Sequence, residues 1–511
     1  MISCVELEQP GKWHLILSGV ILALAFCPNL PLFWLLVSGT SSFVWENLGP
    51  GFASALSHSL VVCAASSAAS VLIGLPAGAL AGLYEFPGRR MFLWIIAIPL
   101  LVPSFLWAIG LSQLGVGLSG ITGGTYAFTS LGLPLVLYVT FVSARRLTKS
   151  QTEGVRIVGG EWLVLRQAVR AVFPAAFLVG CLSGLLSLSD PGPGQILGFS
   201  DVASEILVSF SALYDFELAA RQCLVLSAIV AFIALPLAIL IVPGIAPRLL
   251  GKDIEPTPLT NNRTVRWLGP VFFGAIVTLT MGLPILGIIL PMFSRFSWEL
   301  AMSEITRTIG DTVFYAILAG LFATVLGWLL AIAVGRGRRL AQTAVIGLFL
   351  LLSLPPELGA LGVIRWGTAA PAALDFFLRD RTVVGIISAL RFLPIAAIIM
   401  IRGVGTTSPT SALAAAVHGI PITRYMWRVA GPQMIPFVTI STAIVALLST
   451  ASVSIALLLR PPGADTLPIA IFTVMANAPE SLVATLCFFY IAGAALLLAA
   501  GCQLTRWSRF Q

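Results

Sequence analysis

Residues 59–82, SLVVCAASSAASVLIGLPAGALAG, and residues 311–335, DTVFYAILAGLFATVLGWLLAIAVG, are the two stretches that decide the fold. Each is longer than the roughly 18 apolar residues that mark a candidate membrane span. In hydrocarbon such a run has to be helical, because a helix pairs every backbone N–H and C=O within the segment. Both stretches therefore predict helices that cross a lipid bilayer.

The composition of the whole chain leads to the same fold class. Of its 511 residues, 58% are hydrophobic and only 10% are charged, and the mean hydropathy is +1.00. A water-soluble domain of this size needs more charged surface, so lipid must be the main solvent. We predict an all-α integral membrane protein with about twelve transmembrane helices. The expected spans lie near residues 13–36, 57–83, 91–113, 127–143, 173–189, 221–243, 268–292, 309–334, 341–364, 384–401, 434–458 and 481–503.

The positions of the basic residues predict how the chain is oriented. The net charge of +8 could indicate a nucleic-acid partner, but most of the Lys and Arg residues fall in alternate segments between the spans. Cytoplasmic segments of membrane proteins carry such an excess of positive charge. We therefore predict a multi-pass protein with both termini in the cytoplasm and no nucleic-acid partner. The first run, residues 13–36, lacks a cleavage pattern, and we expect it to be retained as a span.

The order of features divides the chain into two similar halves. Residues 247–266, with the sequence GKDIEPTPLTNNRT inside them, have the Pro, Asn and Thr content of a linker. They separate a first half, residues 1–246, from a second half, residues 267–511. Each half has a long small-residue helix followed by a basic cluster, FPGRR in one and RGRR in the other. Six spans per half would orient both copies in the same direction, with a pathway at the seam between them.

Two long cytoplasmic segments, residues 145–172 and 402–433, carry most of the functional inference. Connections between neighbouring helices in a bundle usually need only about two to eight residues. The second segment and its continuation read SALAAAVHGIPITRYMWRVAGPQMIP. This pattern predicts an Ala-rich helix, a break at residues 419–421, and a second helix that ends at Pro432.

These segments resemble the cytoplasmic signature of the permease subunits of ATP-binding-cassette importers, which is E-A-A, three residues, G, and a proline further on. The second copy matches at Ala414, Ala415, Gly419 and Pro432, with Leu413 in place of the glutamate. The first copy, EGVRIVGGEWLVLRQAVRAVFP, keeps the acid and the glycine but departs at the alanines and places its proline too late. Glu153 and Gly159 match the acid and the glycine of the signature, and Gly154 stands where the signature has its first alanine.

The resemblance implies a type I importer permease fold in a bacterial cytoplasmic membrane. Each signature segment would form a coupling helix seated on an ATP-hydrolysing subunit, so two ATPase copies are expected as partners. A separate solute-binding protein, periplasmic or lipid-anchored, would deliver the solute. This chain would be the transport pathway and not an enzyme, which fits the absence of a G-x-x-x-x-G-K-[ST] phosphate loop in its sequence.

We expect no cofactor and no metal site in this chain. The sequence has only three histidines, and its seven cysteines are scattered without C-x-x-C spacing, as free thiols buried in apolar runs would be.

The fusion of two halves resembles the importer branch for iron(III), thiamine and 2-aminoethylphosphonate. Within this branch the sequence is most similar to the iron(III) permeases. The segments that carry the similarity are FPGRR before LWIIAIPLLVPSFLWAIGL, LRFLPIA, and LLRPPGADTLPI. Thiamine, a phosphonate or another small solute is the alternative within the class. A major-facilitator secondary transporter is the alternative outside it, although GLYEFPGRR lacks the Asp-Arg pair expected there and the predicted spans hold almost no carboxylates.

Arg391 lies near the middle of the tenth predicted span, where a charged side chain is costly. It is either a pathway residue that attracts an anion or gates the channel, or a structural arginine bonded to helix-end carbonyls. Four acids fall in the predicted outer loop between spans five and six. They either meet a cation or its delivery protein, or are ordinary loop carboxylates. These acids are Asp190, Asp201, Glu205 and Asp215.

Overall fold

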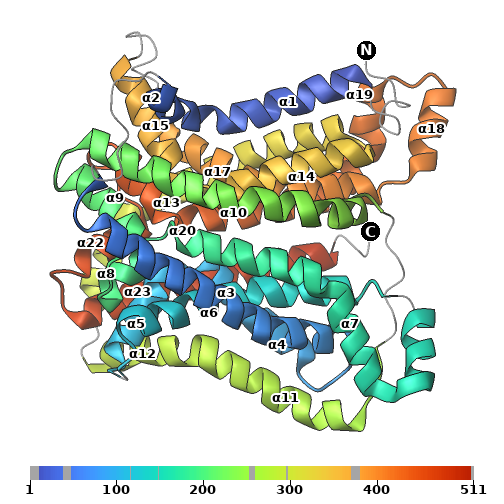
Figure 1. Cartoon of the computed structure of the whole chain (residues 1–511), viewed down its shortest axis with the longest axis horizontal. Helices are drawn as coiled ribbons and strands as arrows, with labels where there is room; N and C mark the ends of the chain where they lie inside the picture. The colour runs from blue at the N-terminus through green and yellow to red at the C-terminus, as the bar shows by residue number, and fades with distance from the viewer. Residues whose placement is uncertain are drawn as a thin grey trace.

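The computed structural model describes residues 11–37, 48–115, 117–147, 149–251, 259–294, 297–369 and 380–507. It is a bundle of long helices that run roughly side by side (Figure 1). Within these residues, ten helices are long and apolar enough to cross a membrane, or up to 12 if each of two bent helix pairs counts as one span. The predicted all-α membrane architecture is therefore confirmed, with ten to twelve candidate spans in the described ranges.

The first part of the chain contains all elements up to α10. They are α1 (Lys12–Phe26), η1 (Cys27–Asn29), α2 (Leu30–Val37), α3 (Phe52–Leu83), α4 (Arg89–Ala97), η3 (Ile98–Leu101), α5 (Ser104–Gln113), α6 (Gly120–Ala144), α7 (Lys149–Ser187), α8 (Gly192–Leu197), α9 (Val202–Ser211) and α10 (Phe216–Leu250).

The second part of the chain contains the elements from α11 onward. Its elements are α11 (Arg263–Val277), η4 (Thr278–Gly282), α12 (Leu283–Ser294), α13 (Trp298–Val334), α14 (Arg338–Ser353), α15 (Pro356–Ala369), α17 (Thr382–Thr406), α18 (Pro409–Val417), α19 (Ile422–Tyr425), η5 (Met426–Ala430), α20 (Gly431–Ala451), α21 (Val453–Leu459), α22 (Leu467–Val474) and α23 (Glu480–Trp507).

Two predicted spans, residues 91–113 and 341–364, are not straight helices. The first bends by 101° between η3 and α5, and the second bends by 83° between α14 and α15. The residue before each proline, Val102 or Leu354, is extended, with ψ of 133° or 149°. The proline ring disfavours the helical conformation of the residue before it, so both spans break where the sequence places a proline.

Two further boundaries of the predicted spans were wrong. The span expected at 434–458 ends at Ala451, and a break at Ser452 separates it from α21. The helix expected to end at Pro432 does not end there, because η5 leads directly into α20 with Pro432 in its first turn. A proline is tolerated in the first turn, where its missing N–H would have no intrahelical partner.

The linker is shorter at both ends than the predicted residues 247–266. Helix α10 continues to Leu250, and α11 begins at Arg263. Between them, Thr260 pairs with the end of α3: its N–H donates to Leu83 O at 2.9 Å, and its carbonyl accepts from Glu85 N at 3.1 Å. Residues 252–258 of the predicted linker lie outside the described residues.

Helices of the two parts interleave at the seam. Helix α1 packs on α13 and α14, whereas α12 packs on α5. The α5–α12 contact is close because glycines meet there: a Cβ on Gly287 would lie 1.7 Å from Gly110 O. Small residues let membrane helices approach backbone to backbone. The bundle is therefore held together across the seam and not only within each part.

Candidate functional site

A cavity of about 170 Å³ lies where the helix breaks of both parts meet. Residues at these helix breaks line the cavity. The lining comes from the starts of α5 and α15, from the connections α7–α8 and α20–α21, and from α17 and α22. In membrane proteins, non-helical backbone at this depth is tolerated where it lines a cavity or is buried in protein. Paired breaks at corresponding positions are a pointer to a binding site.

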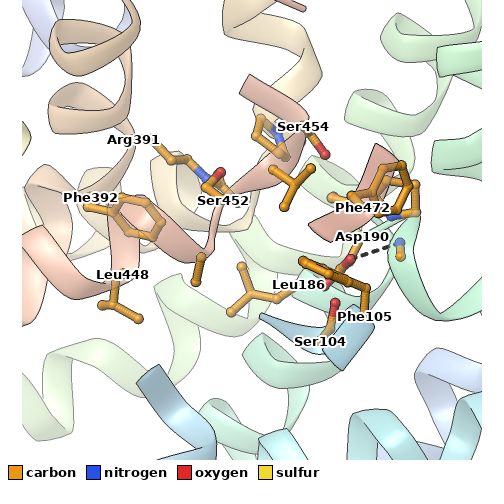
Figure 2. Close-up of a pocket in the computed structure, with 16 residues that line it drawn as sticks. Ser104, Phe105, Leu186, Asp190, Arg391, Phe392, Leu448, Ser452, Ser454 and Phe472 are labelled. Carbon is orange, nitrogen blue, oxygen red and sulfur yellow. Dashed lines mark hydrogen bonds between the residues drawn. The ribbon is translucent and has the colours of Figure 1, made fainter. Parts of the chain in front are cut away.

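Arg391 and Phe392 enter this cavity from α17 (Figure 2). One guanidinium nitrogen of Arg391, Nη1, donates to Leu351 O at 3.0 Å and also to Leu354 O. These carbonyls lie at the C-terminal end of α14, where the 83° bend leaves them without helical partners. Arg391 thus lines the cavity and also caps a helix end, as the structural alternative for this residue predicted.

Glu357, in the first turn of α15, is a buried acid close to Arg391. Its side chain is 0% exposed, and neither carboxylate oxygen makes a hydrogen bond of normal geometry within the described part of the chain. It interacts electrostatically with Arg391 and with the hydroxyl of Ser454. An ionised carboxylate in such a place needs a compensating charge, which Arg391 supplies.

Asp190 lies on the other side of the cavity from Arg391 (Figure 2). One of its oxygens, Oδ1, accepts a hydrogen bond from Gly192 N at 3.1 Å, and the Ser104 hydroxyl interacts with the same carboxylate. Ser104 begins α5 and Gly192 begins α8, so two helix starts fix the position of Asp190. No salt bridge to Asp190 occurs within the ranges that the structure describes.

Two other acids of the same connection have structural roles. Asp201 accepts from Ser204 N at 2.7 Å as the N-cap of α9, and Asp215 accepts from Leu218 N at 2.9 Å as the N-cap of α10. A carboxylate at an N-cap pairs a backbone donor that the helix leaves free. Of the acids flagged in this loop, Asp190 is the one that lines the cavity.

A second cavity, of about 370 Å³, adjoins the first along two helices. Helix α17 lines the second cavity with Pro394 and Ile398, which lie about one and two turns beyond Arg391. Helix α7 lines it with Leu182, about one turn before Leu186 of the first cavity. Helices α6, α10 and α14 complete its largely apolar wall. The two cavities therefore follow each other along the seam between the two parts.

The first signature segment forms the beginning of α7 and projects from one end of the bundle (Figure 1). The helix breaks at Gly159 (φ −143°) and Gly160 (φ +63°), and Glu153 and Gly154 lie exposed on the turns before the break. Arg156 spans the break with a 2.7 Å ion pair to Glu161, which also accepts from the Tyr84 hydroxyl at 2.6 Å. The bend is therefore braced against the end of α3.

The second signature segment projects from the same end of the bundle (Figure 1). It consists of α18, a left-handed turn at Gly419 (φ +63°), and α19, as the sequence predicted. Ala415 packs inward with Tyr425 against the end of α13, whereas Ala414 and Pro432 are exposed. Glycine takes the left-handed conformation without the steric cost that other residues incur.

Both segments present apolar side chains to the outside next to their glycine turns. Ile157 is 86% exposed and Val158 is 82% exposed in the first segment, and Val417 is 84% exposed in the second. These side chains lie at the projecting end of the bundle, and exposed apolar groups gathered in one place mark an interaction surface.

Comparisons of the chain with protein-family models, curated proteins and solved structures found no match. The structure brings Arg391 and Asp190 into the central cavity and places the predicted residues of the two signature segments at the projecting end. Sequence reasoning missed Glu357 as a site residue. The signal available was its position directly after Pro355-Pro356 inside an apolar run, where a broken helix can hold an ionisable group.

Proposed function

We propose that this chain is the permease subunit of an ATP-binding-cassette importer in a bacterial cytoplasmic membrane. The observation that carries the proposal is the pair of helix–glycine–helix segments at one end of the bundle, each with exposed apolar side chains at its turn. These segments fit the grooves of two ATPase subunits. The halves, residues 1–246 and 267–511, would each supply one coupling helix.

The cavities at the seam support a solute pathway. The first is lined by broken helices and holds charged side chains, and the second lies nearer the projecting end and is largely apolar. When the ATPase subunits bind and hydrolyse ATP, they would move the two coupling segments and thereby open and close the pathway through these cavities. Such a switch requires the ATPases to bind the two states of the bundle with different affinity.

The charge distribution supports an orientation with the projecting end in the cytoplasm. Arginines near that end include Arg89, Arg145 and Arg338, at the ends of α4, α6 and α14. At the opposite end, several arginines are matched by acids, for example Arg307 and Arg460 with Asp465. An excess of Lys and Arg residues is typical of the cytoplasmic side, so both termini would be cytoplasmic.

Iron(III), delivered by a periplasmic or lipid-anchored binding protein, is the solute that the sequence resemblance favours. Among the described residues, no group of three His, Cys, Asp or Glu side chains is arranged to hold a metal ion. Thiamine, a phosphonate or another small solute is the alternative within the same class of importer.

A secondary transporter is the second candidate function, and Glu357 is the observation that favours it. Transporters driven by ions use buried carboxylates within the membrane. The decisive experiment is reconstitution of the chain with the ATPase encoded nearest to it, with and without loaded binding protein. Stimulated ATP hydrolysis supports the importer, and failure to associate with any ATPase supports the secondary transporter.

Gly419→Val tests the coupling segment directly. We expect normal membrane insertion but at least about a tenfold loss of ATPase binding, because valine strains the left-handed turn and displaces α18. The matched control is Gly117→Val, since Gly117 also has a positive φ (+70°) and open space around it but lies at the opposite end of the bundle. Co-purification of the ATPase at wild-type level with Gly419→Val would contradict the assignment.

A further inference from the structure

We propose that the central cavity is a binding site for a small organic cation, such as an amine or a quaternary ammonium compound, with Asp190 as the group that pairs with its charge. The proposal rests in part on the proposed function, because it names an organic cation in place of iron(III) as the solute of the same pathway. The binding site itself follows from the charges, rings and size of the cavity.

The charges in and beside the cavity do not balance. Arg391 already has partners, because it donates to two carbonyls at the end of α14 and interacts with the buried Glu357. Asp190 faces the cavity from the opposite side and has no cationic partner within the described residues (Figure 2). When both are ionised, the carboxylates of Asp190 and Glu357 outnumber the Arg391 guanidinium by one charge, which a monovalent cation would neutralise.

Aromatic rings cover the side of the cavity near Asp190. Phe105 and Phe472 pack edge to face, with ring centroids 5.5 Å apart, and both line the cavity. Phe392 lines it from α17. The negative face of an aromatic ring attracts a cation, and quaternary ammonium groups are bound in this way. Rings beside a carboxylate suit an organic cation better than a bare metal ion, which prefers several oxygen ligands.

The size of the cavity sets the size of the ligand. A volume of about 170 Å³ is close to that of an engineered cavity of roughly 150 Å³ that accepts benzene. Choline and tetramethylammonium are of this size. Hydroxyls of Ser104, Ser452 and Ser454 border the same space and could accept or donate a hydrogen bond to a polar tail (Figure 2).

The test is calorimetric titration of the purified full chain in detergent with choline and, separately, with its neutral isostere 3,3-dimethylbutanol. We expect saturable choline binding and at least about tenfold weaker binding of the isostere. Asp190→Asn should weaken choline binding at least about tenfold. The matched control is Asp215→Asn, which removes the same charge at an exposed N-cap outside the cavity, where asparagine caps equally well.

Three outcomes would overturn the cation site: no choline binding by folded chain, equal binding of the isostere, or unchanged choline affinity in Asp190→Asn. The comparison of choline with its isostere uses the wild-type chain. It therefore tests whether binding requires the positive charge even if Asp190→Asn does not fold. No ATPase is needed for the titration. If the chain binds choline but associates with no ATPase, the cation site stands and the importer proposal fails. If it associates with an ATPase but does not bind choline, the importer proposal stands and the cation site fails.

Discussion

Gly287→Leu should prevent the chain from folding into a stable bundle. The Cβ of any residue at this position would lie 1.7 Å from Gly110 O, a backbone atom of α5 that cannot move without shifting the whole helix. Gly110 is similarly close to Pro284 O, at 2.2 Å from its own ideal Cβ, so neither helix can yield. Overpacking of this kind costs about 3 kcal/mol or more. The measurement is the yield of monodisperse protein and its thermal unfolding in detergent.

Gly274→Leu is the control for this prediction. Gly274 lies in α11, within the same predicted span as Gly287, and an added Cβ there meets nothing within 4 Å. A leucine at this site should leave yield and thermal stability near the wild-type values. If both variants behave alike, the α5–α12 contact does not determine the stability of the bundle.

Arg391→Met is expected to destabilise the chain by about 3 kcal/mol or more, because it removes a cation that bonds two helix-end carbonyls and interacts with a buried acid. Two effects combine in this variant. Leu351 O and Leu354 O lose their donor at the bend of α14, and Glu357 is left as a buried carboxylate without compensation. Methionine keeps much of the side-chain length, so the loss reports on charge and hydrogen bonding more than on volume.

A double-mutant cycle with Glu357→Gln separates these effects. The double variant should recover much of the stability lost in Arg391→Met, because the uncompensated charge is gone. The remaining loss then measures the capping of α14. Equal losses in the single and double variants would show that Glu357 and Arg391 do not interact, and would remove the charge argument for this pair. Chemical unfolding in mixed micelles provides the comparison.

Much of the projecting end could be predicted from the sequence. Residues 409–425 form a helix, a left-handed glycine turn and a second helix because Ala-rich runs favour helix and Gly419 permits the turn. These are local effects, so they are visible in a short stretch of sequence. The expected end at Pro432 failed because a proline in the first turn of a helix is compatible with helix continuing after it.

The central cavity could not be predicted in the same way. Val102 and Leu354 each precede a proline, which indicates a break, but the angle of each bend depends on the helices packed around it. In the sequence, Glu357 is a single acid within an apolar run, and Asp190 is one of several acids in a predicted loop. Asp190 lines the same cavity as Arg391, and Glu357 is buried close to Arg391, because tertiary packing brings segments that are distant in the sequence together.

The sequence by itself determined that this chain is an all-α membrane protein, because long apolar runs can satisfy their backbone only as helices. It also determined the turn at Gly419, whereas the proline breaks within residues 91–113 and 341–364 appeared only in the structure. Only the tertiary structure decided where Asp190, Glu357 and Arg391 lie relative to one another, and that α5 and α12 meet at Gly110 and Gly287. The physical reason is that helix formation in lipid follows from local composition, whereas the charge balance of a cavity and the close packing of helices depend on which distant segments meet.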